Sequence, residues 1–246
     1  MSKNNFYLLL ILLFLTSCGA VTSLERARQD PLSVEKLVLS NQGLGEFPEE
    51  ITRMTNLQKL VLFNNSITEI PSGIKNLKKL EVLSLGRNQL KTLPEEIGEL
   101  GNLQKLSLEF NDLSSLPGEI GELESLETLE LNYNQLKSLP DEIGDLSELE
   151  YLNLDHNQLS SIPESIGKLQ SLNILIIGKN NLSGQLPGSI GRLTSLSELN
   201  IIDSGPMLEL PYSISNLRNL EYLYIDSSIE LPYSISAMPR LNVIVR

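Results

Sequence analysis

A period of 23 residues runs through most of the chain and restricts the possible folds more than any other feature. Leucine, asparagine and proline each recur at this spacing. The prolines are Pro48, Pro71, Pro94, Pro117, Pro140 and Pro163. The leucines are Leu57, Leu80, Leu103, Leu126, Leu149 and Leu172, and the asparagines are Asn65, Asn88, Asn111, Asn134 and Asn157. A fixed period of this size is typical of stacked structural repeats, so the sequence predicts a solenoid.

One unit, residues 126–148, has the pattern LxxLxLxxNxLxxLPxxIGxLxx. Its LxxLxL part alternates with period two, which predicts a short strand with one face inward and one outward. The asparagine is expected to turn the chain inward, with its buried amide satisfied by neighbouring turns. The proline favours an extended residue before it and begins a segment expected to be short helix or 3₁₀ turn, with acids in its first turn.

A single unit cannot be stable alone. Ordering the backbone costs roughly 1–2 kcal/mol for each of the 23 residues of a unit. Burial returns about 1.5–3 kcal/mol for each of only seven aliphatic side chains, so the total cost exceeds the total return. Stacking the units covers both open faces of each and aligns the strands in one parallel sheet, which we expect to be concave.

The pattern resembles the leucine-rich repeat, from Val34 to the C-terminus. The resemblance implies an α/β horseshoe solenoid, with a parallel sheet of short strands on the concave face and short helical or 3₁₀ turns on the convex face. We count nine repeats and a terminal strand. The repeats begin at Val34, Leu57, Leu80, Leu103, Leu126, Leu149, Leu172, Leu196 and Leu220.

The C-terminal repeats depart from the pattern. Ser204 and Ser228 stand where asparagine is expected, as Gln42 does in the first repeat. The repeats from Leu172 and Leu196 have 24 residues, and the repeat from Leu220 has 21. The Leu172 repeat, with NNLSGQLPGSIGRL, resembles the repeats of plant receptor ectodomains. We therefore expect the C-terminal end to be the least regular part.

The first residues form a separate segment. Lys3 precedes an unbroken apolar run of ten residues, FYLLLILLFL, at positions 6–15. A membrane-spanning helix needs about 20 apolar residues, so this run is too short. A basic start, a short apolar centre and small residues at the exit, such as Ser17 and Ala20, are typical of a secretory signal peptide.

The exit of this segment, Leu15-Thr16-Ser17-Cys18, resembles the lipobox of bacterial lipoproteins. That resemblance implies cleavage before Cys18 and a diacylglycerol on its sulfur, and Gly19 after it implies export to the outer membrane. Acyl chains would hold the protein on a membrane. The competing interpretation is ordinary cleavage after Ala20, which leaves a secreted protein. The expected organisation is a signal peptide at 1–17, a lipidated tether at 18–23, an N-terminal cap at 24–33 and the repeat domain at 34–246.

Composition excludes several kinds of partner. The formal net charge of −12 argues against nucleic acid, whose phosphates require clustered lysine and arginine. It also argues against adsorption to an anionic membrane surface. Cys18 is the single cysteine, so no intrachain disulfide or thiolate metal site can form. We expect a monomer without cofactors or metal.

Catalytic motifs are not found in the sequence. There is no phosphate loop, no GxSxG and no HExxH. His156 is the single histidine and follows Asp155, which permits an acid–base pair but favours a contact residue on a binding surface. The acidic residues that follow each proline recur with the repeat, so a solvated convex face explains them. We therefore expect a protein that is not an enzyme.

The outward positions of the strands supply the candidate binding site. Aromatic residues are scarce in this chain, yet most of those outside the leader fall at these positions, among carboxylates. Exposed rings of this kind favour a protein-contact surface, although some could pack only as cross-strand neighbours. The predicted ligand-binding residues are Phe63, Arg87, Glu109, Phe110, Glu130, Tyr133, Tyr151, Asp155, His156, Glu198, Tyr222 and Tyr224. Rings together with acids predict a protein or peptide ligand with a basic, partly apolar surface.

The whole chain resembles the bacterial leucine-rich-repeat lipoproteins common in spirochaetes. That resemblance implies a lipid-anchored cell-surface protein-binding module without catalysis, of the kind that includes adhesins and host-interaction proteins. The alternative is a structural or scaffolding component of the envelope that binds periplasmic protein or glycan. Fold alone does not choose between them, because function depends on the surface carried by the fold.

Overall fold

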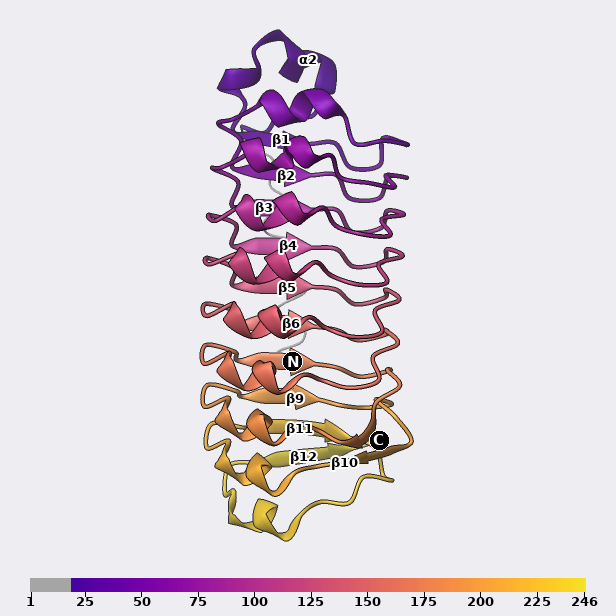
Figure 1. The fold of residues 1–246 in the computed structure, drawn as a ribbon, viewed down its shortest axis with the longest axis vertical. Helices are drawn as coiled ribbons and strands as arrows, with labels where there is room; N and C mark the ends of the chain where they lie inside the picture. Colours follow the sequence, from indigo (N-terminus) through magenta and orange to yellow (C-terminus); the bar gives the residue numbers. More distant parts are fainter. Residues whose placement is uncertain (1–18) are drawn as a thin grey trace.

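A computed structural model describes residues 19–246, and in it the repeats stack into one elongated solenoid (Figure 1). The main sheet is parallel and has ten strands, paired in chain order except where β8 and β10 are passed over. Its strands are β1 (Lys36–Val38), β2 (Lys59–Val61), β3 (Val82–Ser84), β4 (Lys105–Ser107), β5 (Thr128–Glu130), β6 (Tyr151–Asn153), β7 (Ile174–Ile176), β9 (Glu198–Asn200), β11 (Tyr222–Ile225) and β12 (Asn242–Val245).

The register of the sheet repeats the sequence period. Leu60 pairs with Leu83, Leu83 with Leu106 and Leu106 with Leu129, so the central leucines form one fully buried row. The residues on either side of each leucine point the other way, as the pleat of a strand requires. This arrangement confirms the predicted leucine-rich-repeat solenoid.

The opposite face of the solenoid consists of short 3₁₀ turns, stacked in front of the sheet in Figure 1. Each repeat turn follows a proline in extended conformation, such as Pro140 with φ −68° and ψ 152°. The turns are η2 (Glu49–Arg53), η3 (Ser72–Asn76), η4 (Glu95–Glu99), η5 (Gly118–Glu122), η6 (Asp141–Asp145), η7 (Glu164–Lys168), η8 (Gly188–Arg192), η9 (Tyr212–Asn216) and η10 (Tyr233–Ala237). The proline and the inward isoleucine of each turn explain the predicted convex segment.

The repeated asparagine links each repeat to the one before it. In Asn134, Oδ1 accepts a hydrogen bond from the Leu113 backbone N–H at 3.0 Å. Its Nδ2 donates to the carbonyls of Leu108 and Leu131, each at 3.0 Å. Three backbone groups that would otherwise be buried and unpaired are satisfied by one side chain. This asparagine ladder begins at the half-buried Asn65 and continues through Asn88, Asn111, Asn134, Asn157 and Asn180, which are buried.

The asparagine ladder ends after Asn180. Ser204, in the equivalent position, donates only to the Ile201 carbonyl of its own repeat, at 2.5 Å. A second, two-stranded sheet appears next to this point, where β8 (Ser183–Gln185) pairs in parallel with β10 (Met207–Glu209). The sequence did not predict this sheet; both strands belong to the two 24-residue repeats, whose extra residue lengthens the segment after the turn.

The two ends of the solenoid differ. At the N-terminal end, helix α2 (Leu24–Gln29) and the 3₁₀ turn η1 (Pro31–Ser33) cover the first repeat, and Ala27 of α2 is fully buried. At the C-terminal end, Tyr233 is 91% exposed and Val245 is 56% exposed. Among residues 19–246, no helix has the length and apolar character needed to cross a bilayer. The predicted signal peptide and the predicted lipid-bearing Cys18 lie outside the described residues.

Candidate protein-binding face

The outward side of the main sheet, here called the sheet face, carries four columns of side chains. The first column holds the residue that begins each strand, and the second holds the residue two positions later. The third and fourth columns hold the residues four and five positions after the residue that begins the strand. Because the strands are in register, each column contains one residue from every repeat, and neighbours along a column are about 4.8 Å apart at the backbone.

The predicted site residues divide among these columns. Tyr151, Glu198 and Tyr222 lie in the first column, and Glu130 and Tyr224 in the second. The third column contains Phe63, Glu109 and Asp155, and the fourth contains Arg87, Phe110, Tyr133 and His156.

The fourth column forms a continuous stack of side chains. The rings of Phe110 and Tyr133 are 4.2 Å apart between centroids and within 8° of parallel. The rings of Tyr133 and His156 are 3.8 Å apart and within 20°. The Arg87 guanidinium carbon lies 4.6 Å from the Phe110 centroid at one end, and Lys179 Nζ lies 3.1 Å from His156 Nε2 at the other. We call these five residues the ladder.

The ladder presents ring edges, not ring faces, to a partner. The ring faces between Arg87 and His156 are covered by the neighbouring group of the stack, and Lys179 contacts the Nε2 edge of His156. Phe110 and Tyr133 remain 38% and 39% exposed. Flat stacking of a ligand ring or sugar on these faces would require the stack to open, whereas apolar side chains can pack along its edge.

The backbone of the fourth column is left-handed in the first eight repeats, from Asn41 to Asp203. The φ angles are 55° at Arg87, 56° at Phe110, 57° at Tyr133 and 52° at His156. Residues with a Cβ rarely adopt this region, which costs roughly 1–2 kcal/mol for each residue. The turn into the asparagine position requires it, and the stacked side chains offset part of the cost.

Both ring nitrogens of His156 contact neighbouring side chains. Its Nδ1 lies 2.6 Å from Asp155 Oδ2, and Lys179 approaches Nε2. In the neutral ring, Nδ1–H donates to the carboxylate and Nε2 accepts from the ammonium. Within residues 19–246, His, Asp and Glu side chains form no group suited to hold a metal ion.

The acids of the central repeats are mostly engaged within the protein. Glu130 accepts from Ser107 Oγ at 2.6 Å and lies 3.1 Å from Lys105 Nζ. Glu109 packs over Gly86, and its Oε2 is buried without a hydrogen-bond partner. Burial, together with the nearby Glu130 charge, raises the pKa of Glu109 to about 7.

The C-terminal tyrosines form a separate group. The Tyr222 and Tyr224 rings are 6.4 Å apart in β11. In the first column, Ile174 and Glu198 lie between Tyr151 and Tyr222. Burial and the neighbouring Glu198 raise the pKa of Tyr224 above its ordinary value. The predicted site is therefore one face with two aromatic groups, not one contiguous patch.

Sequence reasoning missed the lysines of the same face. The first column begins with Lys36 and Lys59 and reaches Lys105 after Val82. Counting back from Tyr151 in steps of 23 would have found Lys105, Lys59 and Lys36, because these positions share its register. Lys179, at one end of the ladder, was missed in the same way.

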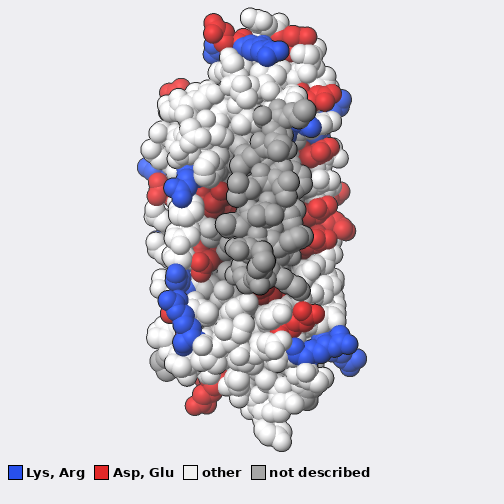
Figure 2. Space-filling view, turned by 180° about the vertical axis from the view of Figure 1, so that it is seen from behind, with Lys and Arg blue, Asp and Glu red and all other residues white. Residues whose placement is uncertain are grey.

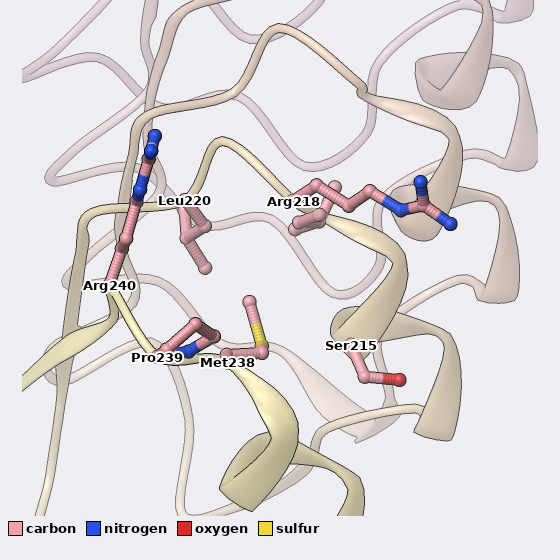
Figure 3. A pocket seen from close by; sticks show the side chains of 7 residues that line it. Ser215, Arg218, Leu220, Met238, Pro239 and Arg240 are labelled. Carbon is pink, nitrogen blue, oxygen red and sulfur yellow. The ribbon is translucent and has the colours of Figure 1, made fainter.

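Figure 2 views the solenoid from the side of the main sheet, opposite to the turns in front in Figure 1. Asp and Glu side chains gather along one flank there, and Lys and Arg side chains form smaller groups. A hollow of about 250 Å³ near the C-terminal end is lined by Ser215, Leu217, Arg218, Leu220, Met238, Pro239 and Arg240. Arg218 and Arg240 point away from each other there, so no polar groups converge on a ligand position (Figure 3).

Two family models match different parts of the chain. A leucine-rich repeat region model matches residues 106–183 and 141–205, and a leucine-rich repeat model matches 33–90 and 55–113. A comparison with curated proteins gives no match. Among solved structures, a leucine-rich-repeat protein of Leptospira interrogans is 30% identical, with a TM-score of 0.57, covering 92% of this chain and 76% of its own. The chain therefore belongs to the leucine-rich-repeat family.

Two plant receptors are also similar. The peptide hormone receptor RGFR1, solved in complex with RGF2, is 35% identical with a TM-score of 0.77 and covers 86% of this chain. The ectodomain of the Arabidopsis thaliana receptor kinase GASSHO1/SCHENGEN3, solved with CASPARIAN STRIP INTEGRITY FACTOR 2, is 31% identical with a TM-score of 0.77 and the same coverage. This chain spans 36% and 27% of those two receptor chains.

Proposed function

We propose that this protein is a non-catalytic binding module whose sheet face contacts a protein or peptide ligand. The single observation that carries the proposal is the ladder, a row of half-exposed rings held at strained backbone positions on an otherwise regular solenoid. Rings of this kind are enriched where proteins contact each other. The two plant receptor structures, which hold ligands on the same fold, support the same use here.

The ligand proposed for the central repeats has a basic, partly apolar surface. Its apolar side chains would pack along the ring edges of Phe110 and Tyr133, and its basic groups would meet Asp155 and the Glu109–Glu130 pair. Several of these acids already have partners, so the expected electrostatic contribution is modest and decreases with salt.

We also propose that the module is exported and held on a membrane through lipid on Cys18, as an outer-membrane or cell-surface lipoprotein with the role of an adhesin. The lipobox pattern after the apolar run supports this anchor. The exposed sheet face would then be presented at the end of a short tether.

Capture of a partner tests the function. The full chain, solubilised in mild detergent, would be used to retain binding proteins, and Tyr133→Ala and Tyr151→Ala would each weaken a retained partner by about 2 kcal/mol. The control is Glu96→Ala in η4, on the opposite face, which should change affinity little. Loss of binding in Glu96→Ala with full affinity in the tyrosine variants would place the site on the other face. Protease treatment of intact cells would degrade a surface protein and spare a periplasmic scaffold.

A further inference from the structure

The charges of the sheet face are segregated along the solenoid. In the four columns, the charged residues of β1, β2, β3 and the segments after them are Lys36, Lys59 and Arg87, and none is acidic. From β5 onward the columns carry five acids, Glu130, Asp155, Glu198, Asp203 and Asp226, and two cations, Lys179 and Arg246, so this half is acidic on balance. This is an unexpected distribution on a chain whose net charge is −12.

The cationic half is created by register. Lys36 pairs directly with Lys59 on the neighbouring strand, and Lys105 follows Val82 in the same column. Like charges placed opposite each other on adjacent strands are unfavourable. Burial lowers the pKa of Lys59, and the Lys36 and Lys105 charges lower it further, as expected for cations held close together.

The boundary between the halves is an ion pair. Lys105 of β4 contacts Glu130 of β5, so the last lysine of the first column is neutralised. Glu109, in the third column of the β4 repeat, lies near the same pair. Glu35 and Glu81, which precede β1 and β3, belong to none of the four columns. The positive half therefore extends over β1 to β3, about 10 Å at the usual strand spacing.

We infer that the ligand is a bipolar peptide segment, lying along the solenoid with an acidic end over Lys36, Lys59 and Arg87 and a basic end over the acids from β5 to β9. This inference rests on the proposed function and adds the chemistry and position of the ligand's acidic end. The distance from β1 to β9 is about 34 Å, which an extended peptide of roughly ten residues spans. Opposite charge at each end fixes the position of the ligand along the face as well as attracting it.

A uniform polyanion, such as a sulfated polysaccharide, fits less well. A chain longer than the positive half would extend over Glu130 and Asp155, whose charges repel it. Tyr151 and Ile174 continue the lysine column and offer apolar contacts suited to peptide side chains. The observations therefore favour a peptide, and a polyanion is one of the outcomes of the test.

The test uses labelled synthetic peptides as probes. One peptide has four aspartates, a Ser-Tyr-Ser-Tyr centre and four lysines, and a second has the same composition with aspartate and lysine alternating. Fluorescence anisotropy at low salt should show that the full chain binds the block peptide about ten-fold more tightly than the alternating one. Equal affinities for the two peptides, or no binding of either, would overturn the inference.

Charge-reversal variants locate the acidic end. Lys36→Glu with Lys59→Glu should weaken the block peptide about ten-fold, and the milder pair Lys36→Gln with Lys59→Gln should weaken it about three-fold. The matched control is Lys91→Glu with Lys137→Glu, two exposed lysines outside the columns that give the same change in net charge. An equal loss in both Glu pairs would mean that only net charge matters. Circular dichroism checks that each variant is folded, and the Gln pair keeps the test valid if the Glu pair unfolds.

Two further results separate this inference from the proposed function. Heparin that binds more tightly than the block peptide, and loses affinity in the Lys36→Glu, Lys59→Glu variant, would replace the peptide with a polyanion. In a second outcome, Tyr133→Ala and Tyr151→Ala release the captured partner, while the lysine variants bind the block peptide normally. The inference of a bipolar ligand is then wrong, and the proposed function of the sheet face is retained. Loss of the captured partner only in Glu96→Ala would overturn both.

Discussion

The carboxylate of Glu109 occupies the space beside the Cα of Gly86, where any side chain at residue 86 would overlap it. The two residues lie in the same column on consecutive repeats. Glycine on one repeat therefore allows a glutamate on the next to fold down against the sheet. That position explains why burial raises the pKa of Glu109 to about 7.

The protein should lose stability as the pH rises, through Glu109. Its folded pKa lies above the ordinary value of 4.5, so between pH 4.5 and 7 the folded state keeps a proton that the unfolded chain releases. By linkage, the free energy of unfolding falls across this window, by up to about 3 kcal/mol. Glu109→Gln should remove this contribution, so its stability relative to wild type should increase from pH 4.5 to 8. Urea titrations at several pH values measure the difference, and parallel curves would contradict the prediction.

Asn134→Ala should destabilise the middle of the array. The change leaves the Leu113 N–H and the Leu108 and Leu131 carbonyls without their partner. We expect a loss of about 1–3 kcal/mol in the free energy of unfolding, seen as a lower denaturant midpoint. Gln158→Ala, an exposed amide next to Asn157, is the control and should change the midpoint little. An unchanged midpoint for Asn134→Ala would mean that the ladder of asparagines contributes nothing.

Glycine should be better tolerated than alanine at position 133. Tyr133→Ala removes the stacking with Phe110 and His156 and keeps a Cβ at φ 57°. Tyr133→Gly loses the same stacking and relieves the left-handed backbone, so it should be about 1 kcal/mol more stable than the alanine variant. Tyr133→Phe, which keeps the stack, should remain close to wild type. Denaturant midpoints of the three variants give the order, and alanine equal to or above glycine would argue against backbone strain.

The leucine strands, the proline turns and the asparagine ladder could be predicted from the sequence, because each depends on a residue type repeated at a fixed spacing. The sequence left short helix and 3₁₀ turn open for the segment after each proline, and the structure shows 3₁₀ turns. The β8–β10 sheet could not be predicted, since SGQ at 183–185 has neither alternation nor β-branched residues.

The site was predicted less completely. The outward rings were found, but the left-handed backbone beneath them was not, because Arg87, Phe110 and Tyr133 have no preference for it. Asn41 and Asn64, which do tolerate it, occupy the same column and were the available signal. Glu109 packs against Gly86, and Glu130 contacts Lys105, each one repeat away, so the sequence of a single repeat does not reveal these contacts.

Hydrogen exchange should be faster at the C-terminal end. Beyond Asn180 the asparagine is replaced, and Ser204 bonds only within its own repeat. Coupling between neighbouring repeats is therefore weaker there, and repeats at an end open first. Backbone amides after residue 196 should exchange faster than those between 80 and 170. Equal protection across the two regions would show that the asparagine ladder does not set local stability.

Cys18→Ala should abolish lipid attachment. The expectation comes from the Leu15-Thr16-Ser17-Cys18 pattern after the apolar run. Cells given a palmitate analogue should label the wild-type protein and leave the variant unlabelled and unprocessed, as seen by gel mobility. Ser17→Ala keeps a small residue before the cysteine and is the control, expected to be labelled normally. Labelling of the Cys18→Ala protein would show that the lipid is attached elsewhere or not through this motif.

The asparagine ladder also has a direction. Each amide bonds to backbone groups of the repeat before it, as Asn157 does to Leu136 and Leu131, so every turn is fastened to its N-terminal neighbour. A force applied between the two ends of the chain would then meet its weakest resistance past Asn180 and its strongest in the central turns. Such a protein would extend under tension by releasing turns singly from the C-terminal end, while the N-terminal and central turns of the sheet face kept their shape.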